Sequence, residues 1–171
     1  EDIGDLDFYD IFDNFYPILY GQSIPYVADE NLAAGAVYQI PEEIFENVIM
    51  TYFNVNKEAL RRETTYISEK AAYEYRPRGF YEVEYSDIPY PEVVDYTENQ
   101  DGTITLIVNA VYSNGNTSVA YSHRTVIRPL DGDCFQYVSN QMTFLEDEHD
   151  IWWHSDRLTK EEWLEIYGGI E

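Results

Sequence analysis

The stretch VVDYTENQDGTITLIVNAVY, residues 93–112, carries the clearest strand signal in the chain. β-branched and aromatic residues dominate it, and alternate positions from 104 to 112 place apolar side chains on one face. Two similar runs follow it, SVAYSHRTVIRP (118–129) and CFQYVSNQMTF (134–144). Turn-forming residues separate the runs, namely Ser113-Asn114-Gly115-Asn116 and Asp131-Gly132-Asp133. The pattern predicts an antiparallel meander of three strands.

Helical spacing dominates the part of the chain that precedes these runs. Apolar residues recur at steps of three and four in DLDFYDIFDNFYPILYG (5–21), which predicts an acidic amphipathic helix with Pro17 inside it. A second helix is predicted over IPEEIFENVIMTYFN (40–54), with Pro41 at its first position. Asn56 is the expected N-cap of a short helix, KEALRR (57–62).

Shorter signals complete the pattern. TTYIS (64–68) and AAYEY (71–75) flank Glu69-Lys70 as a predicted hairpin. Thr159 and Glu162 form the T-x-x-E pattern of a capping box, so a last helix is expected there, ending at Gly168-Gly169.

Helices first and strands afterwards are typical of an α+β domain. We therefore expect a single domain over 1–171, mainly helical over 1–62 and mainly strands over 64–145. Residues 150–171 would form a clamp segment and the C-terminal helix. The antiparallel sheet is expected to pack against the N-terminal helices. By element order alone, the nuclear-transport-factor-2-like and cystatin-like folds are the nearest analogies.

Charge limits the classes of partner. The chain has 33 acidic and 10 basic side chains, a formal net charge of -23, and 17 tyrosines. Binding to nucleic acid needs lysine or arginine at the phosphates, so we predict no nucleic-acid partner. Anionic membrane surfaces are disfavoured for the same reason. A neutral glycan, a peptide or a cationic protein is compatible with the charge.

Three blocks of the sequence resemble a known family. FENVIMTYFNVNKEALR (45–61), PEVVDYTENQDGTITLIVNAVY (91–112) and TVIRPLDGDCFQYVSN (125–140) are similar to an uncharacterised family of lipoproteins, predicted to be secreted, from Gram-positive gut bacteria. The resemblance covers about Ile40 to Asn140. It implies export and attachment at the cell surface, but no catalytic or binding residue. A lipid-bearing cysteine is absent and the chain begins at Glu1. We therefore expect a trimmed form, with membrane attachment only through a removed anchor.

The stretch DIWWHSDRL (150–158) is the first candidate site, because Trp152 and Trp153 could stack on a ligand. Adjacent residues of an extended segment point to opposite sides, so both rings cannot lie on one flat platform. The segment also joins the sheet to the capped helix. We therefore favour a clamp, in which one of the two rings is buried. The alternative is a platform on which a ligand stacks.

The sequence patterns for a metal site and for a catalytic nucleophile are weaker than the aromatic pattern of residues 150–158. His149 and His154 stand near Asp147, Asp150 and Asp156, but neither HExxH nor a calcium loop is present. Cys134 with His123 could form a nucleophilic pair only by the chance placement of neighbouring strands. We predict no metal site, no cofactor and no catalytic residue. Cys134 is the single cysteine, which excludes an internal disulfide.

These observations favour a non-catalytic extracellular domain that acts as a binding or scaffold module. Its candidate ligand-binding residues are Trp152, Trp153, Tyr121 and His123. The alternative is a small enzyme or small-molecule carrier with a pocket between a curved sheet and the helices. Tyr121, His123 and buried acids would line that pocket.

Overall fold

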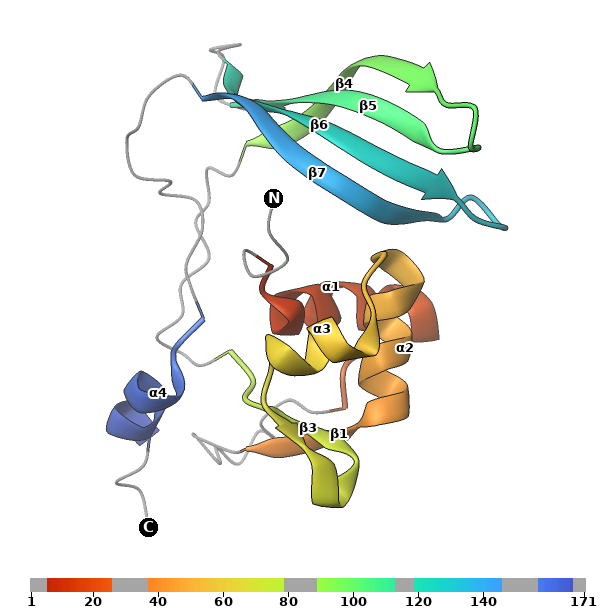
Figure 1. The fold of residues 1–171 in the computed structure, drawn as a ribbon. Coiled ribbons are helices and arrows are strands. Elements are labelled where there is room, and N and C mark those ends of the chain that lie inside the picture. Colours follow the sequence, from red (N-terminus) through yellow and green to blue (C-terminus); the bar gives the residue numbers. More distant parts are fainter. Residues whose placement is uncertain (1–5, 26–36, 79–88, 113–118, 146–156, 168–171) are drawn as a thin grey trace. The chain divides into compact units, whose positions relative to one another are not determined.

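The computed structural model describes residues 6–25, 37–78, 89–112, 119–145 and 157–167 (Figure 1). The chain divides into two compact units. The helical unit comprises Asp2–Thr51, Val55–Val83 and Asp156–Glu171, and the sheet unit comprises Glu1, Tyr52–Asn54 and Glu84–Ser155. Helices and antiparallel sheets together confirm the α+β class. A single domain, the packing of the long sheet on the helices and the two fold analogies stay predictions.

The helical unit contains the four α-helices of the described chain and a small sheet. The helices are α1 (Phe8–Tyr20), α2 (Glu42–Tyr52), α3 (Lys57–Arg62) and α4 (Lys160–Tyr167). The strands are β1 (Tyr38–Pro41), β2 (Tyr66–Ile67) and β3 (Ala72–Tyr75), antiparallel in the order β1-β3-β2, with a 3-10 turn over Ser68–Lys70. In the described residues, no helix has the length and apolar character needed to cross a membrane.

Local capping fixes where these helices begin. The Asp7 carboxylate accepts from the Tyr9 and Asp10 backbone N–H groups at 2.9 and 3.0 Å, which starts α1. Asn56 Oδ1 accepts from Ala59 N at 2.8 Å, as predicted for α3. The capping box of α4 is also confirmed, because Thr159 N donates to Glu162 Oε2 at 2.9 Å.

The start of α2 differs from the prediction. Pro41 is the last residue of β1, where it pairs with Ala72, and the helix begins at Glu42. A proline has no N–H to donate, so it can end a strand as readily as it opens a helix. The preceding strand was missed because its partner, β3, lies far along the chain.

Aromatic rings form the core of the helical unit. Phe12 of α1 stacks on Phe45 of α2 with ring centroids 5.1 Å apart, and Phe45 stacks on Tyr73 of β3 at 4.5 Å. Tyr75 meets Phe12 edge-on at 5.9 Å. Full burial of each such ring contributes about 1.5–3 kcal/mol. The rings therefore join two helices to the small sheet.

The sheet unit is an antiparallel meander with one strand more than predicted. Its strands are β4 (Tyr90–Glu98), β5 (Ile104–Val111), β6 (Val119–Pro129) and β7 (Phe135–Leu145), in the order β4-β5-β6-β7.

The additional strand arises because the run over 93–112 is a hairpin. Asn99 N donates to Thr103 O at 2.8 Å, and Gly102 takes the left-handed conformation at φ 80°. A three-residue loop with glycine at its last position matches the twist of the two strands. The predicted turn at Asp131-Gly132-Asp133 is confirmed between β6 and β7, and Leu130 N donates to Cys134 O across it at 2.9 Å. The other predicted turn, Ser113 to Asn116, lies outside the described residues.

Candidate binding surface

One face of the four-stranded sheet gathers the predicted residues Tyr121 and His123. Across the strands, Val93 pairs with Val108, Val108 with His123, and His123 with Met142. Residues paired across two strands share a face of the sheet, and so do alternate residues of one strand. We call this the Val108 face, and its members from the described registers include Pro91, Val93, Tyr96, Glu98, Ile104, Leu106, Val108, Ala110, Tyr121, His123, Thr125, Ile127, Asn140 and Met142.

Tyr121 and His123 lie side by side on the Val108 face. Their ring centroids are 4.8 Å apart at 75°, an edge-to-face contact. Asn140 Oδ1 accepts from Thr125 Oγ1 at 2.8 Å, so the amide nitrogen of Asn140 faces His123 Nδ1 at 3.3 Å. Which of the two nitrogens donates in this contact depends on the tautomer of the imidazole. Both rings are half-buried.

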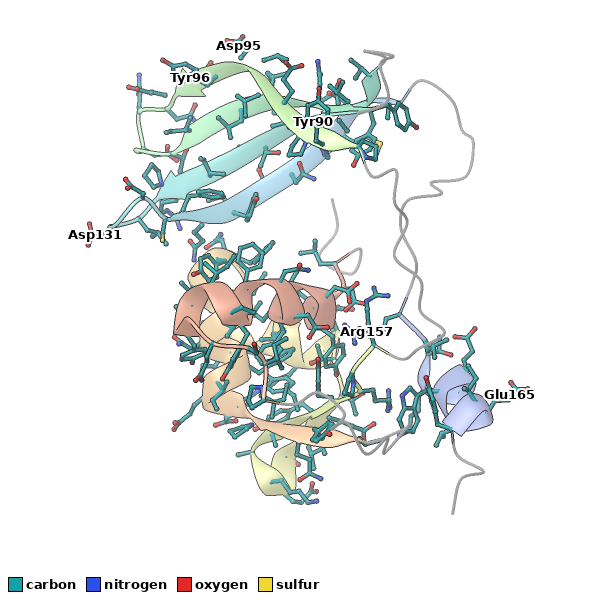
Figure 2. All side chains as sticks on the ribbon, turned by 180° about the vertical axis from the view of Figure 1, so that it is seen from behind. Tyr90, Asp95, Tyr96, Asp131, Arg157 and Glu165 are labelled. Atoms are coloured by element: carbon teal, nitrogen blue, oxygen red, sulfur yellow. The ribbon has the colours of Figure 1, made fainter. Side chains whose placement is uncertain are left out.

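Strand β4 forms one edge of the sheet, and all nine of its residues are exposed. Its large apolar side chains are unusually accessible: Tyr90 48%, Val93 55%, Val94 50% and Tyr96 64%. Figure 2 shows Tyr90 near one end of β4 and Tyr96 toward the other. Apolar side chains gathered on an edge strand mark a surface at which another chain can dock.

The carboxylates of β4 accompany these apolar side chains. Glu92, Asp95 and Glu98 are exposed, and within the described part of the chain none of them forms an ion pair. Asp95 Oδ1 accepts from the backbone N–H of Tyr96 at 2.8 Å. Pro91 and a register shift between Val93 and Asp95 interrupt the edge. Acids, proline and bulges on an edge discourage pairing between copies of one chain.

A partly buried charge cluster in the helical unit holds the C-terminal segment. Arg157 Nη2 donates to Asp10 Oδ1 and to Asp13 Oδ2, each at 2.6 Å, and Nη1 donates to the Arg76 carbonyl at 2.8 Å. Arg78 also forms an ion pair with Asp10. Figure 2 shows Arg157 beside α1. We call Arg157, Arg78, Asp10 and Asp13 the Arg157 cluster. It fastens the residues before α4, which is the role predicted for a tryptophan of the same stretch.

The two carboxyls of this cluster have opposite pKa shifts. Burial raises the pKa of Asp10, but hydrogen bonds from Arg78 and the charge of Arg157 outweigh it, so the net pKa is lowered. For Asp13, burial dominates and the pKa is raised despite the adjacent Arg157. Tyr75 Oη donates to Asp13 Oδ1 at 2.6 Å. Each of the four side chains forms an ion pair with another member, although Arg157 Nε has no hydrogen-bond partner among the described residues and lies 3.8 Å from Asp7 Oδ2. We therefore assign the cluster to structure and not to catalysis.

A second cluster surrounds the buried carboxylate of Glu46. Lys57 Nζ lies 2.6 Å from Oε2, Arg61 Nη2 lies 2.8 Å from Oε1, and Tyr73 Oη donates to Oε1 at 3.0 Å. Burial raises the pKa of Glu46, but these hydrogen bonds outweigh it and the net pKa is lowered. The cluster joins α2, α3 and β3, again as part of the core.

The remaining predicted candidates are not brought together. Cys134 is exposed at the β6–β7 turn, next to Phe135, which pairs with Pro129, whereas His123 lies farther along β6. Since strand residues rise about 3.3 Å each, roughly 20 Å separates the two along β6. Trp152, Trp153, His149 and His154 lie outside the described residues. Where the structure describes the chain, no three His, Cys, Asp or Glu side chains gather as metal ligands.

A family model matches most of the chain. Residues 1–157 match a family of unknown function, DUF6070. The chain belongs to the DUF6070 family. The match includes both units but ends before α4. No curated protein and no solved structure matches the chain.

The β4 surface of this DUF6070 protein was not predicted from the sequence. Val93, Val94 and Tyr96 were predicted as the start of one long strand, so the separate edge strand that they form was not expected. The signal that could have found them is local. Pro91 and three carboxylates interrupt the apolar pattern before the turn residues 99–102, and such residues favour an edge strand.

Proposed function

We propose that this DUF6070 protein is a non-catalytic binding or scaffold module that acts outside the cell, attached to the cell surface. The exposure of Tyr90, Val93, Val94 and Tyr96 on β4 supports the binding role most strongly. The extracellular setting and a lipid anchor rest on the resemblance to lipoproteins predicted to be secreted.

The burial of the exposed apolar side chains of β4 against a partner is energetically favourable. Each half-exposed valine or tyrosine gains on the order of 1 kcal/mol when a partner removes its apolar area from water. Several such side chains on one strand can form the apolar centre of an interface, and the carboxylates around them form a polar rim. The net charge of -23 limits the partner to a neutral glycan, a peptide or a cationic protein.

A double variant tests the proposal. Val93→Ser with Tyr96→Ser removes two exposed apolar side chains of the Val108 face. Binding to glycan and peptide arrays should fall at least tenfold, while the urea midpoint changes little because both side chains are more than half exposed. The matched control is Ile18→Ser on α1, since Ile18 is 63% exposed. Array binding that survives the double variant would contradict the proposal.

A further inference from the structure

We infer that β4 accepts an extended, cationic segment of a partner protein as a fifth strand. This inference rests on the proposed binding function and names the partner by its chemistry. The segment would alternate lysine or arginine with apolar residues. Backbone hydrogen bonds supply the affinity in such strand addition, and alternate side chains supply the specificity.

The backbone of β4 can accept another strand on its outer side. β4 is hydrogen-bonded to β5 and stands at the end of the order β4-β5-β6-β7. The Tyr96 N–H donates to the side chain of Asp95, which indicates that this donor is not used in the ladder with β5. An added strand could replace the carboxylate as its acceptor. The half from Asp95 to Glu98 fits best, because Pro91 and the register shift interrupt the other half.

The side chains of β4 define the pattern of the partner. Val93 and Tyr96 lie on the Val108 face, whereas Glu92 and Asp95 pair with Asn109 and Ile107 on the opposite face. A strand added beside β4 would therefore meet Val93 and Tyr96, with Glu98 at the end of the strand, on the Val108 face, and the carboxylates of Glu92 and Asp95 on the other face. Alternating apolar and basic residues match the two apolar side chains on the first face and the two carboxylates on the second.

Charge decides between a foreign segment and a second copy of this chain. Two copies paired through β4 would bring Glu92, Asp95 and Glu98 of each copy close to the same carboxylates of the other. Like charges directly opposite one another destabilise a pair of strands. The basic residues of the sheet unit's strands, Arg124 and Arg128, lie on β6 and not on β4. The edge is complementary to a cationic partner and repels its own copy.

The experiment uses the full chain and a labelled synthetic peptide of alternating valine and lysine, about as long as β4. Fluorescence anisotropy measures binding at low and high NaCl. Two further peptides carry backbone N-methyl groups, either at every valine or at every lysine. Alternate N–H groups of a strand face opposite edges, so strand addition tolerates one of these peptides and excludes the other. We expect at least a tenfold loss of affinity for one methylated peptide and less than threefold for the other.

Charge reversal at the edge provides the matched test within the protein. Asp95→Lys should lower affinity for the unmethylated peptide at least fivefold at low salt, whereas Glu165→Lys, the same charge change at an exposed site of α4, should alter it less than twofold. Figure 2 labels both positions. Equal losses for the two variants would show attraction by net charge alone and would overturn the inference.

The two proposals fail in different ways. If the Val93→Ser, Tyr96→Ser variant loses array binding but both methylated peptides bind like the parent, strand addition is wrong and the binding function stands. No binding of the parent peptide also overturns strand addition. If the double variant keeps all its array binding, the proposed function fails first.

Discussion

At the scale of single residues, the guanidinium of Arg157 lies between two carboxylates one helical turn apart on α1, Asp10 and Asp13. Its side chain is 9% exposed. Arg157→Ala leaves two partly buried carboxylates with one of their cations removed, which should cost about 2–4 kcal/mol of unfolding free energy. Urea denaturation followed by circular dichroism measures the loss.

The matched control for Arg157 is Arg62→Ala. Arg62 pairs with Glu63 at the surface, and its side chain is 64% exposed. Solvent screens such a pair, so the change should stay within about 0.5 kcal/mol. Equal losses for the two variants would show that the Arg157 cluster contributes no more than a surface pair.

Glu46 predicts a pH dependence of stability. Its folded-state pKa is lowered, because hydrogen bonds from Lys57, Arg61 and Tyr73 outweigh the effect of burial. A carboxyl with a lowered pKa stabilises the fold above its ordinary value of 4.5, and this contribution disappears as the pH falls below it. Glu46→Gln should therefore flatten the decline of the urea midpoint between about pH 5 and pH 3.

Glu43→Gln is the control for this experiment. Glu43 is exposed in the first turn of α2 and lies on the same helix as Glu46. The variant should keep the decline seen in the parent protein. The role of Glu46 is contradicted if both variants follow the parent over the whole pH range.

At the scale of elements, Gly102 determines the hairpin between β4 and β5. Its φ is 80°, and a Cβ added there would meet no atom within 4 Å. Gly102→Ala should therefore cost only the left-handed backbone conformation, about 1–2 kcal/mol. The neighbouring exposed position provides the control, because Gln100→Ala needs no positive φ. A urea midpoint unchanged by Gly102→Ala would mean that the turn relaxes to another form.

Elements with local determinants were predictable from the sequence. The caps at Asn56 and Thr159, and the hairpin around Glu69-Lys70, depend on residues within a few positions of each other. Strand β1 was not predictable, because its four residues are held by β3, whose residues follow more than thirty positions later. The β4–β5 hairpin was missed because strand-forming residues lie on both sides of its turn. The polar residues of the turn look like the polar positions of a single long strand.

The candidate surface was predictable only in part. Alternation along one strand placed Tyr121 and His123 on the same face, and the contact between their rings agrees with that. The exposure of Val93 and Tyr96 depends on β4 standing at the edge, which follows from the order of strands. A pattern of single residues contains no strand order, so core and edge valines look alike in the sequence.

At the scale of the whole molecule, aromatic residues serve two purposes. In the helical unit, Phe12, Phe45 and Tyr73 are fully buried and stack on one another. In the sheet unit, Tyr90, Tyr96 and Phe135 are exposed. The expectation that the rings mainly supply buried apolar bulk therefore holds for the described core of the helical unit but not for the edge of the long sheet. Of these exposed rings, Tyr90 and Tyr96 on β4 are the ones assigned to partner binding.

The net charge of -23 should make stability depend on salt in an unusual direction. Repulsion among many exposed carboxylates opposes the compact state, and NaCl screens it, since the Debye length falls from roughly 30 Å at 0.01 M to about 10 Å at 0.1 M. The buried pairs at Arg157 and Glu46 are screened much less. Raising NaCl to about 0.5 M at pH 7 should therefore raise the melting temperature by several degrees. Near the isoelectric point of about 4.1 the repulsion disappears, and so should the gain. A melting temperature that falls with salt at pH 7 would mean that surface ion pairs stabilise this protein more than its excess carboxylates destabilise it.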